Sequence, residues 1–343
     1  MDPPVTPALW RALALVFGAS LFAWFLSQFD LLELFMQVAN AGWTVVIGAL
    51  FIYLAGFYVD SITWHLCLTT PPLSWSWSVR IFLIRVAGET YNALLPAAGF
   101  GGEPLKILLL KRHYGIDVHE STASVIVSRT VNLISLIIFL LAGFALIIAS
   151  PVLQGELKWI AGIGLGALSM GTAGFWAVQH HGGLSTLLRR ILPRQQRWAE
   201  HMEVLEAHFA AFYRKTRGRV PAAIALALVN WLIGTLEVWF IMLMLGVPVS
   251  FAEALIIESA TQLVRTGAFF IPAALGAQEG VLMLMAGALT GQVAASAAMA
   301  LIRRARELLW LALGVAISVM LIRSAAIPTD AEFLSGTKIT TKD

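Results

Sequence analysis

Pro96-Ala-Ala-Gly-Phe-Gly-Gly-Glu103 interrupts a strongly apolar part of the chain with proline, glycine and a carboxylate. A second segment, Pro272-Ala-Ala-Leu-Gly-Ala-Gln-Glu279, does the same in the C-terminal half. Interruptions at corresponding places in the two halves of an apolar chain are typical of membrane proteins that are built from two repeats with broken helices. The two segments therefore predict a repeated architecture with one broken hairpin in each half.

The composition places the chain in a membrane. Hydrophobic residues make up 59% of it, charged residues only 13%, and the mean hydropathy is +0.80. These values predict an all-α polytopic membrane protein. The single cysteine, Cys67, excludes an internal disulfide and a cysteine-based metal cluster. We expect about six full spans, at residues 10–29, 43–68, 119–150, 157–178, 222–245 and 293–322, and two re-entrant broken hairpins, at 79–110 and 251–289.

The distribution of basic residues predicts the topology. The segment 180–220 carries eight of them, which indicates that it lies in the cytoplasm. These residues are Arg189, Arg190, Arg194, Arg197, Arg214, Lys215, Arg217 and Arg219. With both termini cytoplasmic, the hairpin at 79–110 is entered from the cytoplasm and the one at 251–289 from outside. The basic residues Lys106, Lys111 and Arg112 then also belong to the cytoplasmic side.

The two halves read as an inverted repeat within one membrane domain, residues 1–324. Repeat 1 covers about 43–150 and repeat 2 about 222–323, joined by the cytoplasmic basic linker 180–220 and followed by a flexible cytoplasmic tail, 325–343. Part of the linker, 198–212, has apolar residues at helical spacing; it is either an amphipathic helix on the inner leaflet or a solvated connection.

A matched spacing of charges supports the repeat. Arg129 follows Glu103 by 26 residues, and Arg304 follows Glu279 by 25. Each arginine lies about eleven residues into its span, which at about 1.5 Å per residue is close to the middle of the membrane. We therefore expect each glutamate to lie near the arginine that follows it.

Ionisable residues inside the apolar regions are the main candidates for a functional site, because each costs about 2.5–3.5 kcal/mol at the bilayer centre. An arginine there can bind a phosphate oxygen while a glutamate holds the arginine when no ligand is bound. The alternative is that these residues form structural ion pairs that fix helix register. The candidate headgroup-binding residues are Arg85, Arg129, Arg265, Arg303 and Arg304, and their candidate partners are Glu89, Asn92, Glu103, Glu258, Glu279 and Glu307.

Other residues are assigned supporting roles. Asp60 and Glu237 lie in the spans that precede the hairpins and are candidate proton relays. The histidines show no metal-ligand spacing with cysteine or carboxylate, so we expect no metal. No nucleotide-binding pattern is present, and no cofactor is expected. The candidate hairpin hinges are Pro96, Gly99, Gly101, Gly102, Pro272 and Gly276.

The run Arg85-Val-Ala-Gly-Glu-Thr-Tyr-Asn-Ala-Leu-Leu-Pro-Ala-Ala-Gly-Phe-Gly-Gly-Glu-Pro-Leu-Lys106 resembles the signature of the membrane region of lysylphosphatidylglycerol synthases, a family also called flippase-like. The segments 272–279 and 303–307 add to the resemblance. Within the family, the chain most resembles the hopanoid-biosynthesis-associated proteins of the bacterial inner membrane. In the larger relatives, the multiple peptide resistance factors, a separate cytosolic domain attaches the amino acid. Only about twenty residues follow Ile322, so we expect no aminoacyltransferase domain.

Three functions remain open on the sequence. The leading hypothesis is a lipid flippase or transporter that moves an anionic, polyprenyl-type or hopanoid lipid between leaflets of the bacterial inner membrane, without catalytic residues. The first alternative is an intramembrane enzyme that acts on a lipid phosphate or a lipid-linked sugar, with the same carboxylates as acid and base. The second is a non-catalytic scaffold of a lipid-synthesis complex. The expected partners are a membrane lipid and lipid-biosynthesis enzymes, and not nucleic acid.

Overall fold

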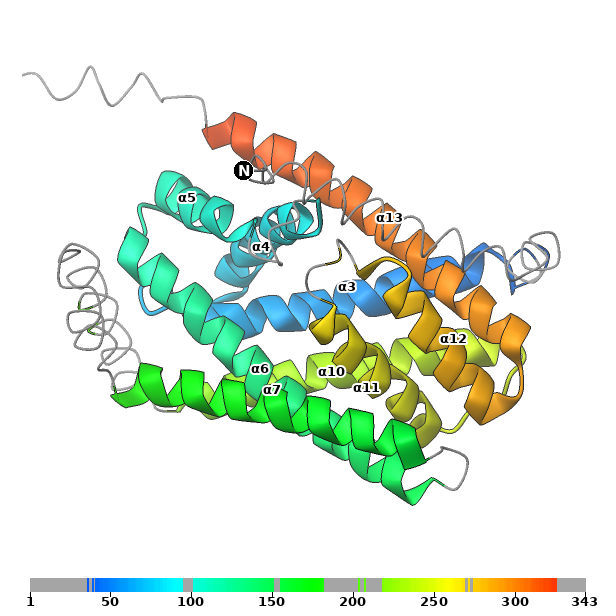
Figure 1. The fold of residues 1–343 in the computed structure, drawn as a ribbon. Coiled ribbons are helices and arrows are strands. Elements are labelled where there is room, and N and C mark those ends of the chain that lie inside the picture. The colour runs from blue at the N-terminus through cyan, green and yellow to red at the C-terminus, as the bar shows by residue number, and fades with distance from the viewer. Residues whose placement is uncertain are drawn as a thin grey trace, which may run out of the picture.

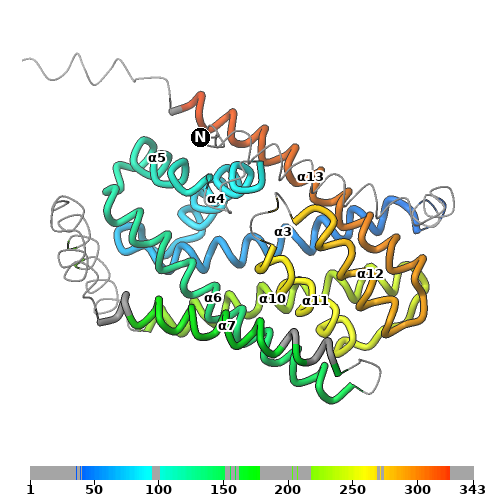
Figure 2. The backbone as a smooth tube through the Cα atoms, in the orientation of Figure 1, coloured from blue at the N-terminus to red at the C-terminus, as the bar shows by residue number. Residues whose placement is uncertain are grey.

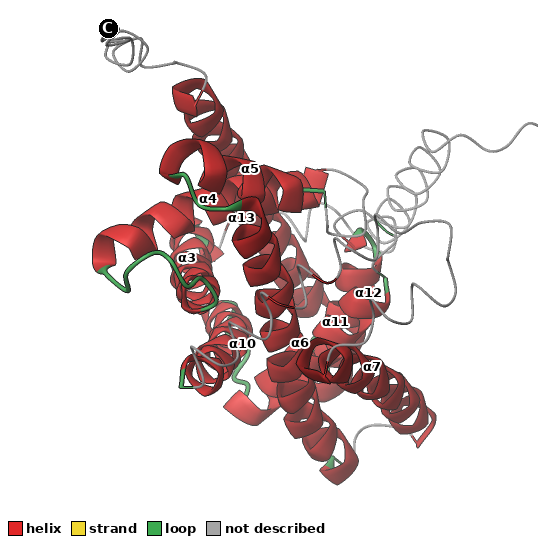
Figure 3. Ribbon diagram, turned by 90° about the vertical axis from the view of Figure 1, so that its left-hand side faces the viewer, coloured by secondary structure: helices red, strands yellow, loops and turns green. Residues whose placement is uncertain are grey.

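The computed structural model describes residues 36, 39, 41–94, 101–150, 155–181, 203, 207, 218–268, 271 and 274–325. These residues form α-helices and contain no strand (Figures 1 and 3). The all-α architecture expected from the sequence is therefore confirmed. The helices are α3 (Trp43–Leu66), α4 (Trp75–Leu94), α5 (Glu103–Tyr114), α6 (Val118–Ala149), α7 (Gly155–His181), α10 (Arg219–Met244), α11 (Phe251–Gly267), α12 (Ala277–Thr290) and α13 (Val293–Ala325).

Four of these helices, α3, α6, α10 and α13, are long and apolar enough to cross a membrane. They agree with four of the six expected spans to within a few residues. α7 covers the expected span at 157–178 and packs on α6 and α11. The expected span at 10–29, most of the amphipathic segment at 198–212 and the tail after residue 325 lie outside the described residues. The four long apolar helices make this a multi-pass membrane protein.

The two broken stretches are each divided into a pair of helices. The stretch 79–110 contains α4 and α5 instead of one continuous helix, and the stretch 251–289 contains α11 and α12. α5 begins after Gly102 with a proline in its first turn, where a missing N–H costs nothing. α12 begins after Gly276, whose φ of 78° favours glycine, and the Gly276 N–H donates to the Glu279 side chain at 2.8 Å.

The helices of the two halves pack in matching pairs. In the first half α3 contacts α4, α4 contacts α5, and α5 contacts α6; in the second half the same relation links α10, α11, α12 and α13. The halves also exchange contacts, because α4 packs on α13 and α11 packs on α6. α3 and α10 share the most extensive helix interface. In Figures 1 and 2 the α4–α5 pair lies at the left end of α3 and the α11–α12 pair at the right.

Two glycines allow the exchanged contacts to be close. A Cβ atom on Gly314 of α13 would lie 1.9 Å from the Thr90 Oγ1 atom of α4. A Cβ atom on Gly143 of α6 would lie 2.0 Å from the Ser259 Oγ atom of α11. Thr90 and Ser259 each follow a buried or half-buried glutamate, Glu89 or Glu258. In both halves, a glycine on the long helix therefore receives the small hydroxyl residue of the other half's hairpin.

We expect Gly314→Ala to destabilise the protein by about 1–3 kcal/mol, because the new methyl group overpacks the α4–α13 contact. Thermal unfolding in detergent measures the loss. Thr90→Ala removes the atom in conflict, so the double variant should recover most of the stability. Gly166→Ala on α7 is the matched control, since nothing lies within 4 Å of its added Cβ atom. Equal melting temperatures for Gly314→Ala and Gly166→Ala would contradict the close contact.

Candidate functional site

A group of charged and polar side chains joins the first hairpin to α6, and we call it the first charged cluster. Its members are Glu89 and Asn92 on α4, Glu103 and Lys106 on α5, and Arg129 on α6. Two carboxylates thus face two cations, and the cluster is balanced in charge.

Lys106 connects the two carboxylates of this cluster. Its Nζ atom lies 2.6 Å from Glu89 Oε1 and 3.1 Å from Glu103 Oε1. Arg129 approaches the same oxygens: its Nε atom donates to Glu103 Oε1 at 3.1 Å, and its Nη2 atom lies 3.5 Å from Glu89 Oε1. Each carboxylate therefore has two positive neighbours, as buried charges require.

Glycines bring α4 and α5 close enough for these contacts. A Cβ atom on Gly88 would lie 2.3 Å from the Lys106 side chain, and one on Gly102 would lie 1.8 Å from the Gly88 carbonyl oxygen. The Gly102 N–H donates to Asn92 Oδ1 at 2.6 Å. Gly102 has a φ of −96°, which any residue can adopt. A hinge at Gly102 remains a prediction, and the structure in addition requires glycine there for space.

The members of the first charged cluster differ in exposure. The Arg129 side chain is 36% exposed, whereas those of Glu103 and Lys106 are 9% and 3% exposed. Arg129 is therefore the member that an outside ligand reaches most easily. Lys106, one of the basic residues that the sequence predicts on the cytoplasmic side, is buried between two glutamates. Its position three residues after Glu103 on a helix was the sequence signal for this contact.

The second charged cluster joins α10, α11 and α12 to α13. Its members are Glu237, Glu258, Gln262, Gln278, Glu279, Arg303, Arg304, Arg306 and Glu307. All are buried except Arg304 and Glu307, whose side chains are 11% and 17% exposed.

Arg304 joins two carboxylates in this cluster. Its Nε atom donates to Glu279 Oε1 at 2.6 Å, and its Nη1 atom donates to Glu307 Oε2 at 2.6 Å. Gln278 donates to the other oxygen of Glu307 at 3.1 Å. The Glu279–Arg304 contact thus repeats the Glu103–Arg129 contact of the first half.

Arg303 forms a second and separate ion pair. Its Nη1 and Nη2 atoms donate to the two oxygens of Glu258 at 2.7 and 3.2 Å, and Gln262 donates to Glu258 at 2.7 Å. In the first half Asn92 donates to Glu89 at 3.0 Å in the same way. An amide one turn after a hairpin glutamate therefore occurs in both clusters.

The remaining candidates lie apart from these contacts. Arg85 is buried and forms an ion pair with Asp60 on α3, so each of these two residues already has an ionic partner. Arg265 is exposed on the last turn of α11, and within the described residues it makes no ion pair. The sequence places Arg306 among the ionisable residues in apolar context without assigning it a role, and it does not single out Gln262 or Gln278. The expected hinges Pro96, Gly99 and Pro272 lie outside the described residues.

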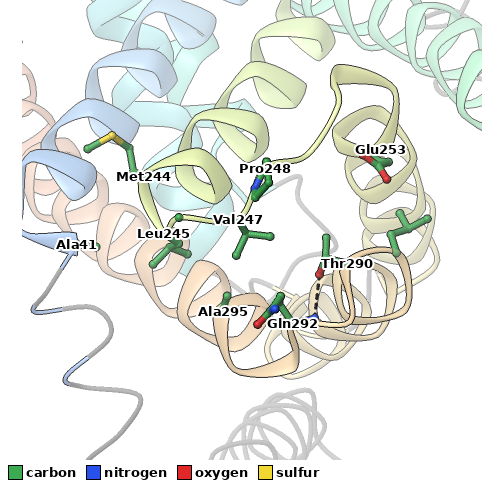
Figure 4. Close-up of a pocket in the computed structure, with 11 residues that line it drawn as sticks. Ala41, Met244, Leu245, Val247, Pro248, Glu253, Thr290, Gln292 and Ala295 are labelled. Carbon is green, nitrogen blue, oxygen red and sulfur yellow. Dashed lines mark hydrogen bonds between the residues drawn. The ribbon is translucent and has the colours of Figure 1, made fainter.

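A cavity of about 810 Å³ lies away from both clusters (Figure 4). The α10–α11 connection, the end of α12 and the start of α13 line it, and Glu253, Thr290 and Gln292 are its main polar residues. None of the charged-cluster residues lines this cavity. In the described part of the chain, no group of histidine, cysteine and carboxylate residues could hold a metal ion.

Lys106→Met tests whether the first charged cluster depends on its buried lysine. The substitution keeps the apolar stem but leaves two carboxylates against Arg129, and breaking a buried ion pair costs about 3–5 kcal/mol. We expect a much lower melting temperature in detergent. Lys111→Met is the matched control, because Lys111 is exposed on the same helix. If both variants melt alike, Lys106 does not hold the cluster together.

Comparison with known proteins places the chain in a family. No curated protein and no solved structure matches it. The protein-family model described as the lysylphosphatidylglycerol synthase TM region matches residues 11–322, which include both hairpins and both charged clusters. Because the match covers most of its length, the chain belongs to the family of the lysylphosphatidylglycerol synthase transmembrane region.

Proposed function

We propose that this protein is a lipid flippase or transporter of the bacterial inner membrane. The observation that carries the proposal is the occurrence of two matched glutamate–arginine contacts, Glu103–Arg129 and Glu279–Arg304, each between a broken hairpin and a long apolar helix. Family membership supports a role in lipid metabolism or transport. A purely structural bundle gains little from so many buried charges, since apolar replacements of buried pairs are often neutral or stabilising.

Arg129 is the proposed headgroup-binding residue. A guanidinium binds a phosphate through two parallel hydrogen bonds, so a lipid phosphate can replace Glu103 as its partner. Lys106 contacts both Glu89 and Glu103, and it remains beside them when Arg129 turns to the ligand. The two carboxylates then keep a positive neighbour throughout the exchange. The half-exposed Arg129 and the buried Lys106 thus have separate tasks.

The second charged cluster is proposed to act as the opposite gate. The matching helix contacts of the two halves support an inverted repeat, in which α4–α5 and α11–α12 enter the membrane from opposite sides. Alternating access then follows when one hairpin opens while the other stays closed. With the basic linker 180–220 in the cytoplasm, both termini are cytoplasmic. The proposed substrate is an anionic, polyprenyl-type or hopanoid lipid.

The test is lipid movement in liposomes that contain the purified protein. Fluorescent phosphatidylglycerol and phosphatidylcholine are compared by the fraction that an impermeant quencher reaches over time. We expect faster movement of the anionic lipid with the wild type. Arg129→Ala should slow it by about tenfold or more, because charge-assisted hydrogen bonds contribute about 1.5–3 kcal/mol. Glu103→Gln should also change the rate, since it alters the partner that the phosphate displaces.

Controls separate the proposal from its alternatives. Arg112→Ala removes an exposed cation from α5 and should leave the rate unchanged. Arg129→Lys keeps the charge but loses the paired hydrogen bonds, so an intermediate rate is expected. Unchanged movement in Arg129→Ala, at equal reconstitution, would refute the assignment. A new lipid product in mass spectra would favour an enzyme, and lower abundance without altered lipid movement would favour a scaffold.

A further inference from the structure

The second charged cluster contains one carboxylate more than it has cations. Its four carboxylates are Glu237, Glu258, Glu279 and Glu307, and its three guanidiniums are Arg303, Arg304 and Arg306. The first charged cluster has two of each, and Asp60 and Arg85 pair one to one. Among these groups of described residues, the excess negative charge therefore lies in the second charged cluster.

Hydrogen bonds identify the carboxylate that is in excess. Glu258 accepts from Arg303 and Gln262, Glu279 from Arg304 and the Gly276 N–H, and Glu307 from Arg304 and Gln278. Glu237 accepts no hydrogen bond within the described part of the chain, although it is only 2% exposed. Its charge is the least stabilised of the four.

The ionic contacts of Glu237 are also incomplete. Arg306 Nε lies 3.0 Å from Glu237 Oε1, yet neither atom has an aligned hydrogen-bond partner. Arg303 Nη2 lies 3.8 Å from Glu237 Oε2, while its main partner is Glu258. Glu237 is thus the nearest carboxylate to Arg306 and a more distant one to Arg303, and neither contact is an aligned hydrogen bond.

α3, α11 and α13, which pack against α10, contribute to this environment. α13 presents Arg303, Arg306 and Glu307, α11 presents Glu258, and α3 presents Tyr53, whose ring centre lies 3.9 Å from the Arg306 guanidinium. α6 carries Arg129, which pairs with the first cluster instead. Arg265, on α11, is exposed and forms no ion pair with a described residue, although its charge acts on Glu258 and Glu307. A buried carboxylate that accepts no hydrogen bond and shares its cations with other carboxylates is neutralised most easily by a proton.

We propose that Glu237 is the proton-binding site that couples lipid transport to a proton gradient. One proton from water adds to a carboxylate oxygen of Glu237, and the closed second cluster then has three carboxylates and three guanidiniums. When the α11–α12 gate opens and water enters, the proton leaves and no other bond changes. Asp60 has Arg85 as its own partner and is not needed for coupling. The inference rests on the proposed function and names its energy source.

Glu237→Gln tests the proposal in liposomes with an imposed pH gradient. If one proton moves with each lipid, a gradient of one pH unit drives wild-type protein to enrich labelled phosphatidylglycerol in one leaflet by up to about tenfold. Glutamine copies the protonated carboxyl group but cannot release a proton, so the variant should give no enrichment. Glu253→Gln is the control, since Glu253 caps α11 and lines the separate cavity away from both charged clusters, and it should leave the enrichment intact. Equal enrichment by wild type and Glu237→Gln would overturn the proposal.

Infrared spectroscopy of the purified protein gives a readout that does not need transport. A pH titration should show the band of a protonated carboxyl group in wild type and in Asp60→Asn, and its loss in Glu237→Gln. A band that disappears in Asp60→Asn and persists in Glu237→Gln would refute the assignment. If the band depends on Glu237 but no lipid moves, the proton site stands and the transport function fails. If lipid moves without a gradient effect and without such a band, the transport function stands and the coupling fails.

Discussion

A charged side chain at the centre of a bilayer costs about 2.5–3.5 kcal/mol even on a lenient scale, and this cost decides which helices of the chain must meet. Glu89, Glu103, Lys106 and Arg129 come from three helices, and all the ion pairs among them except Lys106–Glu103 join different helices. The need to pair these charges therefore holds α5 against α4 and α6. In the second half the same need joins α10, α11 and α12 to α13.

Pairing at this density depends on close backbone contact. Gly88 leaves room for the Lys106 side chain, and Gly102 lies against the Gly88 carbonyl group. Gly143 and Gly314 allow the hairpins to pack against the long helices of the opposite half. Because membrane helices gain little from apolar attraction to one another, small residues and charge pairs are the means by which such helices associate. The glycines therefore allow the close helix contacts in which the charged side chains pair.

The long apolar helices and one glutamate–arginine contact in each half could be predicted from the sequence. Hydropathy located α3, α6, α10 and α13, because apolar length is a local property. The Glu103–Arg129 and Glu279–Arg304 contacts followed from a repeated spacing. The contacts of Lys106 and Arg306 were not predicted, because they depend on how each helix is rotated about its axis, which neighbouring helices decide. Lys106 precedes the basic pair Lys111 and Arg112 by five residues, but the rotation of α5 buries it among carboxylates.

The charge balance distinguishes two clusters that have similar glutamate–arginine contacts. The first is neutral and has a half-exposed arginine, so it can exchange one anionic partner for another without changing its net charge. The second is buried, has an excess carboxylate in Glu237 and exposes Arg304 much less, at 11%. An anion brought to the second cluster would add to the existing excess of negative charge, whereas a proton would remove it. Electrostatics therefore favours headgroup binding in the first half and proton binding in the second.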